Sequence, residues 1–215
     1  MIPLYHDFTD RTVLVFGGGP VGARKSRRFV REARVVVVSP EFTEDDYGDA
    51  ELVRAKPEEE DVEQWFERTT PALAIAATNA RSVNAAIERE ARTRGVLINR
   101  ADHSGDRGPG GVVVPATVRD GEVSVAISTG GASPALSAEL RRRIEREIEG
   151  AGELAEITAD VREELKARGV DPTRRRHAVR TVVRSSRVWK DLGTGTSNPR
   201  QTVDAVVDSA LGEKS

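Results

Sequence analysis

The sequence predicts an α/β protein with a parallel sheet, followed by a small α+β segment and a helical C-terminal region. Its first half alternates short apolar runs with helical patterns, an order typical of a parallel sheet with right-handed crossovers. The runs are continuously apolar, which indicates strands buried on both faces. After Gly111 the apolar period changes to two and then to helical spacing, so the winding of the sheet is expected to end there.

The first predicted strand and helix flank a glycine turn. Residues 12–16 (TVLVF) are an apolar run, residues 17–22 follow as GGGPVG, and residues 23–32 have helical character. This order predicts strand, turn and helix. A second strand is predicted at residues 35–38 (VVVV), which Ser39 and Pro40 close.

Two further strands are predicted at residues 73–77 (LAIAA) and 96–98 (VLI). Between them, apolar residues at spacing four predict a helix, with Ser82 as its expected N-cap and Gly95 as its expected end. The apolar positions of this helix are Val83, Ile87 and Ala91.

A β-hairpin and a helix are predicted next. Residues 112–117 and the alternating residues 123–127 flank an Asp120-Gly121 turn signal. Ser133 is the expected cap of a helix with Pro134 at its first position. Its apolar stripe consists of Leu136, Leu140, Ile144 and Ile148. Because one hairpin and one helix bury little alone, we expect this segment to pack against a partner subunit.

The tail is predicted to be helical. One apolar stripe ends at Gly169, a second helix is expected from Asp171-Pro172 to about Trp189, and Asn198-Pro199 starts a last helix. Residues 193–197 are expected to form a flexible linker. The chain is therefore expected to have three parts: residues 1–111, 112–150 and 151–215.

Composition excludes several classes of function. Lys and Arg total 33 against 35 Asp and Glu, so no net field attracts nucleic acid, and nine aromatic residues make a base-stacking platform improbable. No cysteine is present, which excludes thiolate metal sites and cysteine nucleophiles. No apolar stretch approaches the length of a membrane span, and the first ten residues do not read as a secretory signal. We expect a soluble, cytoplasmic protein without a permanent metal site.

Gly17-x-Gly19-x-x-Gly22 lies between a predicted strand and a predicted helix, the context in which this pattern indicates a dinucleotide site of the Rossmann type. Bare backbone can approach a pyrophosphate there, and the helix start carries the complementary dipole. The alternative is an ordinary glycine turn. The expected cofactor-binding residues of this motif and of the second strand end are Gly17, Gly19, Pro20, Val21, Gly22, Ser39, Pro40 and Glu41. Glu41 is the candidate ribose ligand, and no arginine cluster follows it, which favours NAD over NADP.

The chain also resembles a known family, the precorrin-2 dehydrogenases or siroheme synthases. The STGGASP segment after an Asn-x-x-Asp strand end is far more specific than the glycine motif, which many oxidoreductases share. The resemblance covers about residues 11–147, and we expect no methyltransferase region. The matching segments are residues 17–25 (GGGPVGARK), 35–40 (VVVVSP), 74–84 (AIAATNARSVN), 97–102 (LINRAD) and 128–145 (STGGASPALSAELRRRIE).

The resemblance implies oxidation of precorrin-2 to sirohydrochlorin with NAD as hydride acceptor, on a homodimer. In some members iron insertion follows, so Fe²⁺ is a candidate chelatase substrate. The family's functional aspartate falls on Asp102 and its serine on Ser128. The cofactor is expected to pass Thr78 and Asn79, and the expected substrate-binding loop is Ser128, Thr129, Gly130 and Gly131.

The chemistry of the residues agrees with this assignment. Oxidation of a reduced tetrapyrrole removes a hydride from carbon and a proton from nitrogen, so a proton acceptor is needed near the nicotinamide. Asp102 follows a strand on the ligand side of a parallel sheet, although it is also a candidate cap of a turn before Gly105. His103 is interpreted as a loop residue. Asn84 is a candidate local cap or cofactor neighbour.

A basic stretch without acidic residues runs from Pro172 to Lys190. Arg176, Arg180 and Arg184 stand one helical turn apart, and we expect them to bind substrate carboxylates. The alternative is a solvated helix face.

Two other classes of protein fit the nucleotide motif: a non-catalytic NAD-sensing module and another NAD(P)-dependent oxidoreductase, because fold alone does not fix the substrate. The sensing module leaves Asp102 and the STGGASP segment unexplained.

Overall fold

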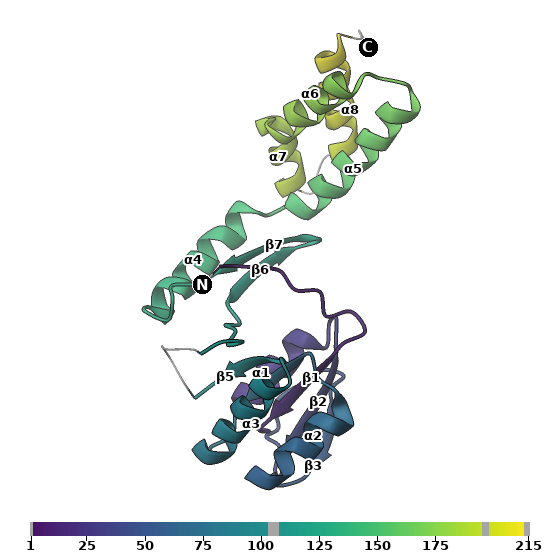
Figure 1. Cartoon of the computed structure of the whole chain (residues 1–215). Helices are drawn as coiled ribbons and strands as arrows, with labels where there is room; N and C mark the ends of the chain where they lie inside the picture. The colour runs from purple at the N-terminus through teal and green to yellow at the C-terminus, as the bar shows by residue number, and fades with distance from the viewer. Residues whose placement is uncertain (1, 103–107, 195–197, 213–215) are drawn as a thin grey trace. The chain divides into compact units, whose positions relative to one another are not determined.

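The computed structural model describes residues 2–102, 108–194 and 198–212. The chain divides into two compact units, Met1–Val114 and Pro115–Ser215 (Figure 1). The expected division of residues 115–215 into two parts stays a prediction.

The first unit is built on a five-stranded parallel sheet in the order β3-β2-β1-β4-β5. Its strands are β1 (Thr12–Phe16), β2 (Arg34–Ser39), β3 (Glu51–Arg54), β4 (Leu73–Ala76) and β5 (Leu97–Arg100). The strand order runs in opposite directions on either side of β1, and a parallel sheet opens a ligand crevice at such a switch point. The predicted Rossmann-like sheet is confirmed; the edge strand β3 was not predicted.

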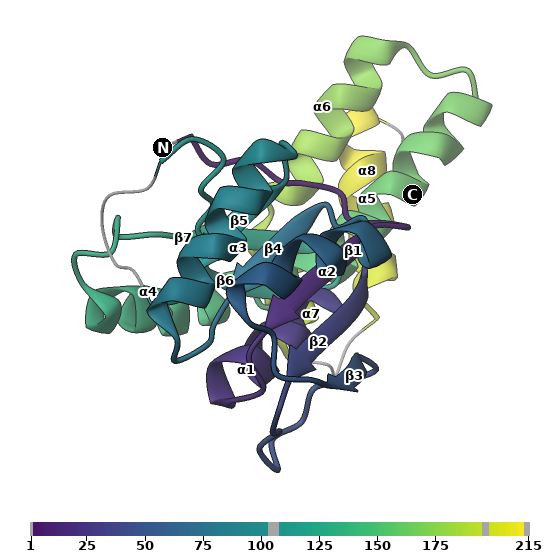
Figure 2. The ribbon, with the colours of Figure 1, turned by 60° about the horizontal axis from the view of Figure 1, so that its bottom comes forward.

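Helices cover both faces of this sheet. Leu14 and Phe16 of β1 pack with the apolar faces of α2 (Val62–Thr69) and α3 (Arg81–Thr93), which lie next to each other in Figure 2. The alternate residues Val13 and Val15 pack on the opposite face with residues such as Ala23 of α1 (Pro20–Phe29). This two-sided burial explains why the strands are apolar at every position.

The start of α3 corrects the predicted cap. Ala80 is the N-cap residue and no side chain caps the helix, so Ser82 lies inside the first turn. The predicted end is confirmed, because Gly95 follows the C-cap with a φ of 67°.

The second unit begins with the predicted antiparallel hairpin, β6 (Ala116–Asp120) and β7 (Val123–Ile127). The hairpin starts four residues later than predicted because residues 111 and 112 extend the first unit. Gly111 forms a parallel bridge with Ile98, and the Val112 N–H donates to the Ile98 carbonyl at 2.8 Å. Helix α4 (Pro134–Glu147) follows, and the Ser133 hydroxyl accepts from the Leu136 N–H as predicted.

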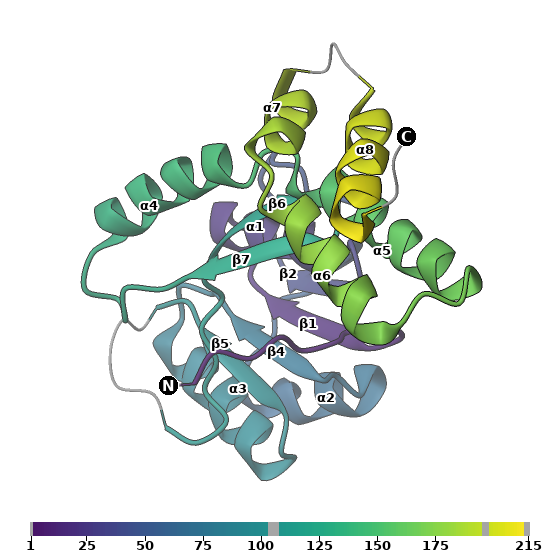
Figure 3. The same ribbon diagram turned by 90° about the horizontal axis from the view of Figure 1, so that it is seen from above.

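Four helices complete this unit: α5 (Ala151–Ala167), α6 (Pro172–Val183), α7 (Ser186–Thr194) and α8 (Pro199–Leu211). They share one apolar cluster and stand apart from α4 (Figure 3). The single predicted helix to Trp189 was wrong: α6 ends at Val183, and the Trp189 indole N–H donates to the Val183 carbonyl at 2.8 Å. Gly193 and Thr194 lie in α7 rather than in a linker, and residues 195–197 lie outside the described residues.

Among the described helices, none is both long and apolar enough to cross a membrane.

Candidate active site

A cleft of about 430 Å³ opens at the carboxyl ends of β1, β2 and β4. Most of the expected cofactor-binding residues line it: Gly17, Gly19, Ser39, Pro40, Glu41, Thr78 and Asn79. Pro20, Val21 and Gly22 do not; they begin α1 beside it. Three parts of the chain that the sequence did not assign to the site also line it, namely Phe42 and Thr43, Lys56 to Glu58, and Ala80 with Val83.

The three glycines of the motif differ in what surrounds them. A Cβ on Gly17 would lie 2.4 Å from the Ala77 carbonyl oxygen, and a Cβ on Gly22 would lie 2.0 Å from the Gly17 carbonyl oxygen. Both glycines are therefore required by the fold itself. Gly19 has an ordinary φ of −88°, and a Cβ there would meet nothing within 4 Å. No neighbour among the described residues requires glycine at position 19, so the open space in front of it fits an approaching ligand.

The start of α1 offers a site for an anion. Gly19 is its N-cap residue, no side chain caps it, and no acidic residue stands in its first turn. The first N–H groups of a helix have no partners inside the helix and carry positive partial charge. The free N–H groups and the open position at Gly19 together fit the pyrophosphate of a dinucleotide.

The end of β2 lies beside basic residues that the sequence did not reveal. Ser39 pairs with Arg54 in the β2–β3 register, and the Arg54 guanidinium donates to the Pro40 carbonyl at 3.2 Å. Lys56 lines the cleft with Glu41 and forms an ion pair with Glu58 at 3.0 Å. The preference for NAD rests on the residues that follow β2 alone, whereas Arg54 at the end of β3 and Lys56 just after it bring two cations to this edge of the sheet.

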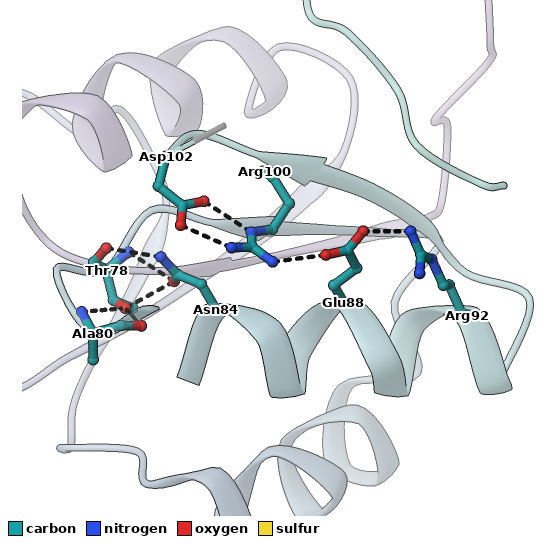
Figure 4. Close-up of polar contacts among 7 residues, drawn as sticks. All are labelled: Thr78, Ala80, Asn84, Glu88, Arg92, Arg100 and Asp102. Carbon is teal, nitrogen blue, oxygen red and sulfur yellow. Dashed lines mark hydrogen bonds and ion pairs between the residues drawn. The ribbon is translucent and has the colours of Figure 1, made fainter. Parts of the chain in front are cut away.

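Asn84 holds the loop after β4 and is fully buried. Its side-chain oxygen accepts from the Thr78 hydroxyl at 2.8 Å and from the Thr78 N–H at 3.3 Å, and its amide donates to the Thr78 carbonyl at 2.9 Å (Figure 4). Asn84 is therefore no helix cap. It fixes a residue that lines the cleft.

Asp102 follows the end of β5 and belongs to a chain of charged groups (Figure 4). The Arg100 guanidinium donates to both of its carboxylate oxygens, from Nε and from Nη2, at 2.8 Å each. The Nη1 group of Arg100 donates to Glu88 of α3 at 2.7 Å, and the other Glu88 oxygen accepts from Arg92 at 2.6 Å. The carboxylate thus binds Arg100 rather than only capping a turn; Gly105 and His103 lie outside the described residues.

These contacts set the charge of Asp102. Its pKa is lowered from 3.8 to about 2, first by the hydrogen bonds from Arg100, against the opposing effect of burial; Asn84 lowers it further through a side-chain hydrogen bond. The same hydrogen bonds raise the pKa of Arg100. Asp102 is therefore an anion at neutral pH. The sequence could have indicated the contact of Arg100 with Asp102, because side chains two positions apart at a strand end project to the same side. Nothing in the sequence pattern indicated that Glu88 also binds Arg100.

The expected substrate loop belongs to the second unit. Ser128 accepts from the Gly130 N–H at 3.2 Å, and Thr129 donates to the Ser133 carbonyl at 3.1 Å. Gly130 and Gly131 have φ angles of 65° and 90°, and a Cβ on either would meet nothing within 4 Å. The loop is thus tied down by its hydroxyl groups and leaves an open surface over its glycines.

The three expected arginines of the tail are exposed. Arg176 and Arg180 lie on α6, whereas Arg184 is the residue that caps its C-terminus, after the last helical residue. Within the described parts of the chain, none of the three forms an ion pair. No group of three or more histidine or acidic side chains that could hold a metal is found among the described residues.

The sheet order, the glycine turn and the cleft define the first unit as a dinucleotide-binding domain. The family model described as "Putative NAD(P)-binding" matches residues 4–116, and the one described as "Sirohaem biosynthesis protein central" matches residues 120–147. The chain belongs to the family of precorrin-2 dehydrogenases and siroheme synthases.

Individual relatives agree with this assignment. The chain is 29% identical to the precorrin-2 dehydrogenase of Methanosarcina barkeri, over 98% of this chain and 95% of the relative. It is 35% identical to the siroheme synthase of Methylococcus capsulatus, over 82% of this chain but only 37% of that longer protein. The solved structure of SirC, a precorrin-2 dehydrogenase, shares the fold with a TM-score of 0.69 and 23% identity, over 97% of this chain and all of SirC.

Proposed function

We propose that this protein oxidises precorrin-2 to sirohydrochlorin with NAD as hydride acceptor. The observation that carries the proposal is a carboxylate held by Arg100 at the end of β5, next to β4, whose following loop lines the nucleotide cleft. Thr78 lines the nucleotide cleft and is held by Asn84, and the pKa of Asp102 is lowered first by the hydrogen bonds from Arg100. A dinucleotide cleft and an ionised carboxylate are the two parts that removal of a hydride and a proton requires.

The residues of this chain divide the chemistry between them. NAD, when bound, supplies the acceptor for the hydride. Gly17, Gly19 and the start of α1 bind its phosphates, and Glu41 binds a ribose. Asp102, which is ionised at neutral pH, accepts the proton released from a ring nitrogen and passes it on to water.

The second unit is proposed to bind the substrate, a ring that carries several carboxylates. Exposed guanidinium groups at Arg176, Arg180 and Arg184 suit carboxylates, and the open glycine loop at residues 128–131 suits a ring edge. If the alternative of a solvated face is right, changing all three arginines to glutamine will leave the KM for precorrin-2 unaltered.

We further propose a cytoplasmic homodimer formed through α4. This helix has an apolar stripe yet no buried residue, and Leu136 is 48% exposed. Iron insertion into the product is a second activity of the same site, with Fe²⁺ as substrate and Asp102 as acceptor of the pyrrole protons.

Anaerobic incubation with precorrin-2 and NAD tests the activity, because absorbance follows the tetrapyrrole and NADH together. We expect oxidation by the wild type and a loss of at least about a hundredfold in Asp102→Asn. The exposed Asp160, remote from the cleft in sequence, provides a control of the same chemistry as Asp160→Asn. Full activity of Asp102→Asn would remove Asp102 from the mechanism, and no activity in the wild type would refute the assignment. Addition of Fe²⁺ to the same mixture tests the chelatase.

A further inference from the structure

Arg100 is largely buried and is held by two carboxylates, unlike an arginine on the surface. Its side chain is only 10% exposed, and it binds two carboxylates at once, Asp102 on one edge and Glu88 on another. All three guanidinium nitrogens donate a hydrogen bond, so the planar group has little freedom to turn. A two-point contact of this kind fixes direction as well as distance.

The anchor for Arg100 comes from a different element. Glu88 lies on α3, while Arg100 ends β5, and Arg92 one turn further along α3 holds the second Glu88 oxygen. The side chains form a row of alternating charge, and their formal charges sum to zero: Arg92, Glu88, Arg100 and Asp102. Each carboxylate in it is paired, so its members compensate one another where solvent is partly excluded.

We propose that Arg100 is a positioning residue, which fixes the direction of the Asp102 carboxylate through a two-point contact, and that Glu88 holds Arg100 in place. The catalytic part of this inference rests on the proposed function of Asp102. A carboxylate has room for about four hydrogen bonds. Arg100 takes one position on each oxygen, which leaves other positions for a pyrrole N–H of the substrate.

The contact between Arg100 and Asp102 is tested without any assay of activity, because its loss should raise the pKa of Asp102. In the full-length protein with ¹³C-labelled aspartate, Asp102→Asn identifies the carboxyl resonance of Asp102. We expect this resonance in the wild type to show no titration midpoint down to about pH 3. In Arg100→Gln we expect a midpoint close to the ordinary value of 3.8. A titration of Arg100→Gln that matches the wild type would overturn the proposal.

A second ion pair on the same helix serves as the matched control. Arg94 caps the C-terminus of α3 and binds Glu90, outside the network of Asp102. Arg94→Gln removes one guanidinium just as Arg100→Gln does, but it should leave the Asp102 resonance and the rate of oxidation unchanged. A shift of equal size in Arg94→Gln would show a general loss of positive charge instead of a specific contact.

The fixing of direction is tested by Arg100→Lys and Glu88→Ala. Lysine keeps the charge but cannot bind both oxygens as a fork, so Asp102 should stay ionised while kcat falls about tenfold or more and the KM for NAD stays constant. Glu88→Ala should lower kcat severalfold with Asp102 still ionised, whereas Glu90→Ala should not. Wild-type kcat in both Arg100→Lys and Glu88→Ala would refute the positioning role, and this result stands even if Arg100→Gln does not fold.

The two proposals fail separately. If Asp102→Asn keeps full activity, the catalytic role of Asp102 is wrong, yet the titration still decides whether Arg100 binds the Asp102 carboxylate. If Asp102→Asn is inactive while the Arg100 variants match the wild type in kcat and titration, the proposed function stands and the role of Arg100 is wrong.

Discussion

The Cα of Gly22 faces the carbonyl oxygen of Gly17 so closely that a Cβ would lie 2.0 Å from it. This contact presses the first turn of α1 against the end of β1, so the glycine motif is partly a packing motif. Gly19, between the two, has no such neighbour.

Two alanine substitutions should therefore separate stability from binding. Gly22→Ala forces the turn apart, and we expect it to lower the free energy of unfolding by about 1–3 kcal/mol. Gly19→Ala keeps an allowed backbone and should leave stability within about 1 kcal/mol, yet weaken NADH binding about tenfold or more, because the methyl group enters the phosphate site. Urea denaturation and NADH fluorescence titration measure the two effects. Equal NADH affinity in Gly19→Ala and the wild type would contradict the proposed phosphate position.

Glu41 and Lys56 line the same cleft with opposite charges, and their balance should decide the coenzyme. In Glu41→Ala we expect NADH affinity to fall about tenfold, because a charge-assisted hydrogen bond to ribose is lost. Affinity for NADPH should rise relative to NADH, since the Glu41 carboxylate no longer repels the 2′-phosphate, while Glu58 stays paired with Lys56. Fluorescence titration with both nucleotides checks this, with the exposed Glu60→Ala as control. An unchanged ratio of the two affinities would exclude Glu41 as the ribose ligand.

The ion pair of Asp102 should also appear in the pH dependence of stability. Its pKa is lowered in the folded protein from 3.8 to about 2, so its ionised form stabilises the fold above pH 3.8, and this contribution is lost as the pH falls towards 2. We expect Asp102→Asn to be less stable than the wild type by roughly 1 kcal/mol near pH 7, because solvent screens part of the interaction. The difference should shrink on acidification. Denaturant unfolding at several pH values measures this difference in stability. A difference that grows towards low pH would contradict a lowered pKa of Asp102 in the folded protein.

The unburied apolar stripe of α4 should hold two copies of the chain together. Leu140 and Ile144 lie one turn apart on this helix and are only partly covered. We expect Leu140→Asp to convert a dimer into a monomer, since a charge would be buried at the interface. Sedimentation equilibrium measures the mass, and circular dichroism shows that the helices persist. Ala138→Asp, on the opposite face, is the control. A dimer that survives Leu140→Asp would place the interface elsewhere.

Local patterns were sufficient wherever neighbours along the chain determine the structure. The strand, glycine turn and helix at residues 12–29 follow from one apolar run and from glycines whose contacts span only a few positions. The hairpin at Asp120-Gly121 and the cap at Ser133 are equally local. The expected cleft residues were found for the same reason, because they directly follow strands that the apolar pattern reveals.

Contacts between distant segments were decided by the tertiary structure alone. Strand β3 has too few apolar residues to be recognised, and so Lys56 was not placed in the cleft. The hairpin began late because residues 111 and 112 pair with β5, and α6 ended early because the Trp189 indole binds its last carbonyl. Glu88 meets Arg100 only because α3 packs along β5. Periodicity and turn residues record what each segment does next to its own neighbours, whereas a charge partner twelve positions away is chosen by packing, which leaves no trace in the spacing of either residue.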